Sequence, residues 1–595
     1  MSWRNWAVKI FASSPSSNEV APLRVPPQVF PSSSHASSLY PIGIPAGECY
    51  KDWMHRNSLP QCSEPRASIC KNHTMNSNQN NLLRLFSASV MLATFAASGY
   101  AQSPGSGNRP NILYILMDDL GYGDVHALNP ERGKIATPNM DRLSAEGMTF
   151  TDCHASPSIC TPSRYSILTG RYDWRTRLQH GVLGGDTPPL IPPGRVTVGE
   201  FLKQHGYATA ALGKWHLGLA FDKKDFSKPI TDGPLQHGFG YFFGLSASLD
   251  MQPYAYIEND HFTQVPSVIK NCAAPNFNRP GPAAPDFESL NVVPDLTRKA
   301  VDYIRARKAQ KQPFFLYLAL PSPHTPLVPT KEWQGKSGLG SYGDYVMETD
   351  WSVGEVLKAI DGAGLRDNTL VMLTSDNGFA PYVGVQKLEE MGHYPSARFR
   401  GYKSDVWDGG HRVPFLVRWP GNIKTNSQSA QIVCLSDLLA TCADLLHAKL
   451  PANAGEDSVS LLPAFLGADK QRLHEAIVNH SGGNGRFAIR QGNWKLELCP
   501  GSGGWGQPGD ADALKEGLPP IQLYNMHDDV GEKINVEGKN TQVVTNLVKL
   551  LEKYVTDGRG TPGLRQMNDV PVDIWSNKNQ RQEAASVRHA PEPAD

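Results

Sequence analysis

The chain has 595 residues, enough for about two to four domains of ordinary size. It is 40% hydrophobic and 19% charged, which is typical of a globular protein. Lysine plus arginine and aspartate plus glutamate both number 57, so the net charge gives no support to binding of nucleic acid or of an anionic membrane surface. Any anion-binding site in this chain must therefore be built locally.

The beginning of the chain differs from the rest. Residues 1–74 are rich in serine, proline and asparagine and show no sustained hydrophobic period, so we interpret them as an upstream extension foreign to the natural protein. Residues 75–101 have a polar start with Arg84, an apolar stretch at 85–97 and small residues at the end, as a secretory signal peptide does. The apolar stretch is short for a membrane-spanning helix. These features predict a periplasmic or secreted protein; the alternative is a genuine leader before an internal buried helix.

Strands alternate with helices over the larger part of the chain. Apolar strand patterns precede polar turns, and amphipathic helix patterns lie between them, which predicts parallel βαβ units buried on both faces. We expect strands within 109–118, 207–214, 313–320, 368–375 and 413–418, and helices within 137–146, 197–205, 295–307, 345–360 and 436–446.

After about residue 470 the pattern changes to antiparallel strands at 487–499 and 521–526, followed by a helix at 545–555. We therefore expect a catalytic domain at 108–470, a smaller C-terminal α+β subdomain at 471–575 and a loose tail at 576–595.

Six cysteines follow the predicted signal peptide, and none forms a CxxC pair or a zinc-ligand spacing. Cys434 and Cys442 fall in one stretch with a helical pattern, where they would lie about 12 Å apart, too far for a disulfide. A disulfide framework therefore does not organise this chain.

Polar side chains follow two of the expected strands. Asp118 and Asp119 end one strand, and Asp376 and Asn377 end another. Either pair alone is explained by turn formation. Both pairs at one edge of a parallel sheet predict an all-oxygen site for Ca²⁺, with Mg²⁺ as the alternative.

Cations and histidines occur at further strand ends. Lys214 and His216 are two residues apart at the end of one strand, His324 lies in "PSPHTP", and Lys403 lies in "RGYKSDVWDGG". A lone histidine is more often structural than catalytic. Several such groups at successive strand ends would bind an oxyanion and protonate a leaving group.

Cys160 stands at the head of a helical pattern in "SICTPSRYSILTG". A cysteine at a helix start is typical of a thiolate nucleophile. A thiolate is nevertheless poorly matched to a hard cation held by carboxylates. The residues alone leave these two interpretations in conflict.

The motif "CTPSR", followed by "YSILTGR", resembles the C-(S/T)-P-S-R…TGR signature of the type I sulfatases. The resemblance continues in order through "NILYILMDDLGYGD", "GKWHLG", "PHTP", "TSDNG" and "DGGHRVPFLVRWPG" to "LYNMHDDVGEKINV". It is strongest to the arylsulfatase A and N-acetylgalactosamine-6-sulfatase branch. It implies an alkaline-phosphatase-like α/β fold with a mixed, mostly parallel sheet, and hydrolysis of sulfuric esters of a carbohydrate or an aryl alcohol.

The resemblance also implies how each site residue acts. Cys160 would be oxidised by a formylglycine-generating enzyme to Cα-formylglycine, whose hydrate attacks sulfur and forms a covalent sulfate ester. Residue 160 would also bind the cation, together with Asp118, Asp119, Asp376 and Asn377. The remaining roles are orientation of the hydrate by Arg164, contact with it by His216, sulfate binding by Lys214, Lys403 and Ser248, and protonation of the leaving alcohol by His324. Ser246 is the alternative to Ser248.

Two other functions stay open at this point. One is hydrolysis of phosphonate monoesters or phosphodiesters, and the other is non-catalytic binding of a sulfated sugar. We expect the substrate preference to come from loops at 221–295 and 381–402 and from the C-terminal subdomain. The aromatic residues of 248–262 are candidates for stacking on a sugar, with core packing as the alternative, and 393–400 would offer a cation to a second anionic group.

Overall fold

The computed structural model describes residues 109–272 and 279–575. The predicted upstream extension at 1–74, the predicted signal peptide at 75–101 and the predicted tail at 576–595 lie outside the described residues. Within the described residues, no helix has the length and apolar character needed to cross a membrane.

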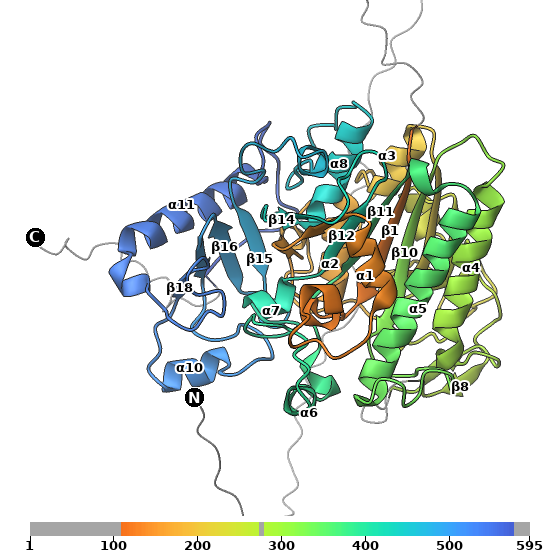
Figure 1. Ribbon diagram of the computed structural model, residues 1–595, viewed down its shortest axis with the longest axis horizontal. Helices are drawn as coiled ribbons and strands as arrows, with labels where there is room; N and C mark the ends of the chain where they lie inside the picture. The colour runs from red at the N-terminus through yellow and green to blue at the C-terminus, as the bar shows by residue number, and fades with distance from the viewer. Residues whose placement is uncertain (1–108, 273–278, 576–595) are drawn as a thin grey trace, which may run out of the picture. The chain divides into compact units, whose positions relative to one another are not determined.

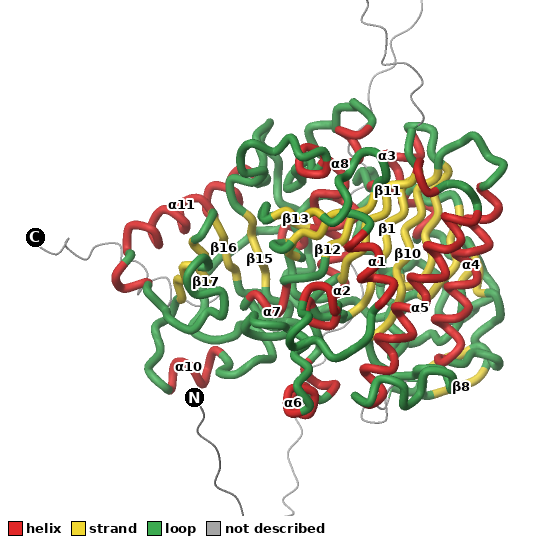
Figure 2. The backbone as a smooth tube through the Cα atoms, in the orientation of Figure 1, coloured by secondary structure: helices red, strands yellow, loops and turns green. Residues whose placement is uncertain are grey.

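A ten-stranded mixed sheet forms the centre of the larger part of the structure (Figure 2). Five neighbouring strands in its middle run parallel, and the strands at both sides add antiparallel pairs. The order across the sheet is β13 (Ser427–Ser429), β2 (Met148–Phe150), β12 (Phe415–Arg418), β11 (Thr369–Ser375), β1 (Asn111–Asp118), β10 (Phe314–Pro323), β4 (Ala208–Lys214), β5 (Tyr241–Leu245), β6 (Ile257–Glu258) and β7 (His261–Phe262).

The central strand β1 is buried along its whole length because both faces of the sheet are covered. Its eight residues, NILYILMD, are all buried, and Leu113 pairs in register with Leu316 on one side and Val371 on the other. Such continuous apolar strands are characteristic of parallel sheets covered by helices. The polar end of β1 is thereby fixed next to the ends of β10 and β11.

Helices cover both faces of this sheet (Figure 1). The helices α1 (Pro138–Ala145), α4 (Val292–Arg307) and α5 (Gly340–Gly362) pack on one face. On the other, α2 (Cys160–Thr169), α3 (Val198–Gln204) and α8 (Leu438–Leu445) pack against one another, and α3 contacts β4. Shorter elements complete this part: α6 (Val385–Glu390), α7 (Asp408–His411), α9 (Leu462–Phe465), the pair β3 (Cys153–His154) and β14 (Val433–Cys434), and the pair β8 (Val268–Lys270) and β9 (Gly281–Ala283).

The helix α2 is completely enclosed. All ten of its residues are buried, and it ends where Gly170 adopts a left-handed conformation with φ of 63°. Glycine takes this conformation without the steric cost of a Cβ atom, which makes it a common helix terminator. The first residue of α2, Cys160, is thus held in a fixed place inside the protein.

A second, four-stranded antiparallel sheet follows later in the chain. Its strands, in order, are β15 (Ile477–His480), β16 (Phe487–Gln491), β17 (Trp494–Glu497) and β18 (Gln522–Asn525). The helix α11 (Thr541–Asp557) packs on β16 and β17 through the apolar face formed by Val544, Leu547, Val548 and Leu551. The short helix α10 (Asp510–Lys515) lies in the connection between β17 and β18.

The second sheet is joined to the segment that leads into α2. His480 N donates to Ser156 O at 2.9 Å, and Ser158 N donates to His480 O at 3.0 Å. Ser404 N in turn donates to Ser158 O at 2.7 Å. The end of β15 therefore extends the backbone hydrogen bonding up to the residues just before Cys160.

The predicted fold class, a mixed and mostly parallel sheet flanked by helices with a smaller α+β part, is confirmed. One local interpretation was wrong: Cys434 lies in β14, outside α8, because the helix begins only at Leu438. All six cysteines of the described residues are free. The predicted division at residue 470 stays a prediction.

Glu348 of α5 generates a test of stability. Its side chain is buried, Oε1 has no hydrogen-bond partner, and burial raises the pKa of this carboxyl to about 7. A carboxyl whose pKa is higher in the folded than in the unfolded protein binds more protons when folded, so it weakens folding as pH rises from about 4.5 through 7. We expect Glu348→Gln to raise the free energy of unfolding at pH 8 by up to about 3 kcal/mol and to change it little at pH 4.5.

Urea unfolding at both pH values measures this difference. Glu355→Gln, in the same helix but partly exposed beside Lys358, is the matched control and should give the same small change at both pH values. An equal effect of Glu348→Gln at pH 8 and pH 4.5 would contradict the assignment.

Candidate active site

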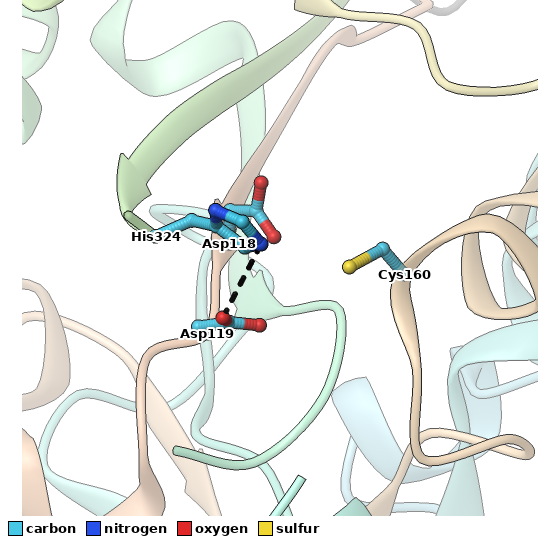
Figure 3. Close-up of side chains that lie close together, drawn as sticks. All are labelled: Asp118, Asp119, Cys160 and His324. Carbon is cyan, nitrogen blue, oxygen red and sulfur yellow. Dashed lines mark ion pairs between the residues drawn. The ribbon is translucent and has the colours of Figure 1, made fainter. Parts of the chain in front are cut away.

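Most of the sequence-predicted site residues come together at the carboxyl ends of the parallel strands. Asp118 is the last residue of β1 and Lys214 the last of β4, while His324 directly follows β10. Asp376 and Asn377 follow β11. Cys160 reaches this edge from the start of α2 (Figure 3). In parallel sheets this edge is the usual position of a ligand site.

The carboxylates are buried in contact with cationic side chains. Lys214 Nζ lies 2.5 Å from Asp118 Oδ2, and Lys403 Nζ lies 2.6 Å from Asp119 Oδ1. Arg164 donates from Nε and Nη2 to Asp376 Oδ2 at 3.0 and 2.7 Å. All of these side chains are at most 3% exposed, so water screens the charges poorly.

The pKa values of two carboxyl groups in this cluster, those of Asp118 and Asp376, shift in opposite directions because their charged neighbours differ. Burial by itself would raise the pKa of Asp118, but Lys214, with His324 and Arg164, holds it well below its usual range. Burial and the neighbouring Asp118 carboxylate raise the pKa of Asp376 to about 6 in spite of Arg164. The cations therefore stabilise the charged form of Asp118 fully, whereas at Asp376 burial and the Asp118 charge outweigh the effect of Arg164.

The donor set fits a hard divalent cation. Asp118 Oδ1 and Asn377 Oδ1 are buried and have no hydrogen-bond partner. Asp118, Asp119, Cys160 and His324 each offer a ligand atom, and these atoms lie within 4.8 Å of one another. Asn377 Nδ2 donates to Asp119 Oδ1 at 2.8 Å, which brings the amide next to the carboxylates. Buried oxygens without partners are costly unless a ligand satisfies them, and a cation would do so.

Cys160 faces this cluster as a neutral thiol. Its sulfur points toward the Asp118 and Asp119 carboxyl groups from the opposite side of the site (Figure 3). Burial raises the pKa of the thiol to about 12, so it stays protonated at neutral pH. Reactive cysteines have a lowered pKa, and this environment therefore does not favour a thiolate nucleophile.

The two histidines of the site have defined hydrogen bonds. His324 Nδ1 lies 2.7 Å from the Thr325 carbonyl oxygen, so Nδ1 is the donor there, and Nε2 faces Asp119 Oδ2 at 3.7 Å. His216 Nε2 donates to Leu183 O at 2.8 Å, whereas its buried Nδ1 has no partner. Burial, with the Lys214 charge, lowers the pKa of His216 well below its usual value, which keeps this imidazole neutral.

Ser246 and Ser248 both lie directly after β5, and both are buried with hydroxyl groups that have no hydrogen-bond partner. Ser246 O accepts from His216 N at 3.0 Å, which places this turn beside the site. Ser248 stays a prediction, with Ser246 as its equal in burial.

Tyr382 is a site neighbour that the sequence analysis did not single out, although it lies in the loop 381–402 from which substrate preference was expected. Its hydroxyl donates to Asp119 Oδ2 at 3.1 Å, and its ring centroid lies 6.5 Å from that of His324. It lies in the connection after β11, and the residues around it form no motif that indicates a functional tyrosine.

Asp124 was also missed, although it belongs to the "GYGD" turn that follows the first carboxylates. It accepts from Tyr342 Oη at 2.5 Å and Gly121 N at 2.7 Å, and it pairs with His393 Nε2 at 2.8 Å. This buried network holds the turn that carries Asp119.

The prediction that the loops 221–295 and 381–402 set specificity stays a prediction, but three of their side chains have structural contacts. Tyr254 is 1% exposed and packs against Phe287, and Tyr256 stacks on Phe243, so core packing explains these two aromatic rings. In the segment 393–400, Arg400 lies over the Trp407 ring and donates to Glu532 O at 2.8 Å. Arg398 of that segment is exposed.

The fold is that of an α/β protein with a mixed, mostly parallel sheet, and carboxylates, two lysines and an arginine are buried together at the carboxyl ends of its parallel strands. The chain belongs to the sulfatase family: the family model described as Sulfatase matches residues 110–448. It is accordingly a sulfuric ester hydrolase.

Individual relatives cover most of the chain. It is 33% identical over 525 residues to an N-acetylgalactosamine-6-O-sulfatase of Bacteroides thetaiotaomicron, covering 80% of this chain and 99% of that one. It is 33% identical over 465 residues to arylsulfatase A of Bos taurus, covering 75% and 86%. A solved sulfatase structure from work on glycosaminoglycan metabolism by Bacteroides thetaiotaomicron has a TM-score of 0.67 and 32% identity, covering 75% of this chain and 99% of that chain.

The Asp124 network gives a prediction for this site. Removing its carboxylate leaves the buried His393 and Tyr342 without their partner, so we expect Asp124→Ala to lower the free energy of unfolding by about 3 kcal/mol. Asp302→Ala, which removes a largely exposed aspartate from α4, should change it by less than about 0.5 kcal/mol. Urea unfolding of both variants measures the difference, and equal values would refute the supporting role of Asp124.

Proposed function

We propose that this sulfatase removes sulfate from a sulfated carbohydrate, accepts aryl sulfates as surrogates, and uses a formylglycine made from Cys160. The observation that carries this proposal is the position of Cys160, a buried neutral thiol at the start of α2 facing a cluster of oxygen donors. A thiol so placed has no reactivity of its own to contribute. The relative named N-acetylgalactosamine-6-O-sulfatase supports a sulfated amino sugar as the substrate.

The formylglycine hydrate would supply a geminal diol, in which one hydroxyl attacks sulfur and the second, once deprotonated, allows sulfate to leave. An ordinary alcohol lacks that second hydroxyl. Residue 160 at the first position of a ten-residue helix also places the reacting anion near the positive end of the helix dipole.

The cation would be held by Asp118, Asp119, Asp376 and Asn377, together with residue 160, and Ca²⁺ suits these oxygen donors, with Mg²⁺ as the alternative. When bound, it would increase the acidity of the nucleophile and neutralise developing charge. Arg164 keeps Asp376 oriented through two hydrogen bonds to one carboxylate oxygen. In this proposal the arginine also orients the hydrate.

Lys214 and Lys403 would bind the sulfate oxygens, since their ammonium groups are buried at the site and approach from two different segments. His324 would protonate the leaving alcohol: with Nδ1 donating to Thr325 O, its second proton is carried on Nε2, the nitrogen that faces the site. His216 would contact the hydrate as a neutral imidazole, and Ser248 would complete the sulfate pocket.

The proposal includes a formylglycine-generating enzyme as a partner during maturation and export to the periplasm or beyond. The support for export is the sequence of residues 75–101.

The first test is the chemical state of residue 160. In protein produced with its maturation enzyme, mass spectrometry of the peptide 159–164 should find an aldehyde in place of the thiol. Cys160→Ala should lower kcat/KM for N-acetylgalactosamine 6-sulfate and for an aryl sulfate by at least about 10³-fold. A thiol throughout an active protein would refute the formylglycine, and activity confined to phosphonate or phosphate esters would refute the substrate class.

The second test concerns the cation. Adding Ca²⁺ at about 100 times its dissociation constant should stabilise the folded protein by about 2.7 kcal/mol. Asn377→Ala should reduce this effect, because it removes a neutral oxygen donor without changing the charge of the site. Thermal unfolding in a titration of Ca²⁺ and then of Mg²⁺ gives the measurement, with Asn422→Ala, an exposed residue, as the control. Unchanged stabilisation in Asn377→Ala would exclude this residue as a ligand.

A further inference from the structure

Two aromatic side chains differ from the other described aromatic side chains in their large exposed fraction. Among the phenylalanine, tyrosine and tryptophan residues that the structure describes, only Tyr382 and Trp505 are strongly exposed, at 40% and 44%. Their rings contact each other, with centroids 5.9 Å apart and planes inclined by 53°. Large aromatic side chains left in water at one place mark a binding surface more often than a packing defect.

This pair begins at the candidate active site and leads outward. The Tyr382 hydroxyl donates to Asp119 Oδ2 at 3.1 Å, and its ring stands at 72° to that of His324. The Trp505 ring contacts the Tyr382 ring and lies one ring farther from His324 in this series of contacts. A molecule with its sulfate among Lys214, Lys403 and residue 160, and its leaving oxygen near His324, would therefore extend beside these two rings.

The side chain of Trp505 is exposed, but the backbone that carries it is restrained by hydrogen bonds. It lies between Gly504 and Gly506, and its backbone N donates to Asp405 Oδ1 at 2.8 Å, as does Gly506 N at 2.7 Å. A Cβ atom at Gly504 would lie 2.3 Å from Ser404 O, so the loop must pass this close to the chain. Ser404 and Asp405 directly follow Lys403. These contacts tie the backbone of Trp505 to the segment that begins at Lys403.

We propose that Tyr382 and Trp505 form a platform for the pyranose ring that carries the sulfate ester. This rests on the proposed function, and it names the part of the chain that recognises the sugar. The face of an indole or phenol ring carries partial negative charge, which complements the C–H groups on the apolar face of a pyranose. The two side chains offer an area that matches one sugar ring and is much smaller than a stable protein–protein interface. The cluster of lysines beside them would bind the sulfate group of the same molecule, so a sulfated sugar fits this surface better than a protein partner does.

The test compares a substrate that has a sugar ring with one that has none. Matured protein is assayed with N-acetylgalactosamine 6-sulfate and with ethyl sulfate, and the ratio of the two kcat/KM values is the readout. We expect Trp505→Ala to lower this ratio about tenfold and Trp505→Phe, which keeps an aromatic face, to restore most of it. Leu514→Ala, which removes a side chain of similar exposure in α10, should leave the ratio unchanged.

A binding measurement makes the outcome independent of turnover. In a Cys160→Ala background, isothermal titration calorimetry with N-acetylgalactosamine 6-sulfate should give a Kd about tenfold higher when Trp505→Ala is added. Thermal unfolding checks that both proteins are folded. An unchanged Kd, an equal loss for ethyl sulfate, or the same loss in Leu514→Ala would each overturn the platform.

The two hypotheses fail in different ways. A matured protein that hydrolyses both esters without any effect of Trp505→Ala on their ratio would refute the platform and leave the sulfatase mechanism standing. A matured protein that hydrolyses neither ester, while its Cys160→Ala form binds the sugar sulfate through Trp505, would refute the proposed substrate and leave the platform standing.

Discussion

The burial of three carboxylates at one edge of a sheet is the constraint on which the rest of this structure depends. Like charges in a poorly screened interior are tolerated only with counter-charges beside them, and Asp118, Asp119 and Asp376 are answered by two lysines and an arginine. Each of these cations arrives from a different element. The strand order and the enclosed helix α2 can therefore be understood as the means by which distant segments deliver opposite charges to one place.

The second sheet contributes to this arrangement through the segment after Lys403. Lys495 of β17 lies 2.9 Å from Asp408 and contacts Glu532, and Arg490 of β16 pairs with Asp152 at 2.9 Å. These buried ion pairs tie α7 and the β2–β3 segment to the antiparallel sheet. The segment that follows Lys403 is thus joined at α7 to the antiparallel sheet through buried ion pairs.

The sequence was most informative where local pattern and chemistry coincide. Apolar strands that end at or just before Asp118, Lys214 and Asp376 identify buried strands and one shared edge of the sheet, so the fold class and the meeting of these residues were predictable. The contact between Tyr382 and Trp505 was not, because the two rings meet across 123 residues of chain and leave no periodic pattern. Tyr254 and Tyr256 are the opposite case. The sequence made them candidates for stacking on a sugar, but their rings pack inside the protein, because no local sequence pattern distinguishes an aromatic ring that packs in the core from one that binds a ligand.

The enclosure of Cys160 has a consequence for the order of events in biosynthesis. Residue 160 is 2% exposed, and the segment before it is closed by hydrogen bonds to His480, which is synthesised 320 residues later. At ordinary rates of translation this interval lasts about 15 to 60 s. An enzyme that alters the cysteine needs access to an open chain, so it must act before the antiparallel sheet docks. Under the proposed function, folding of the last third of the chain would therefore compete with modification of Cys160 in the first third.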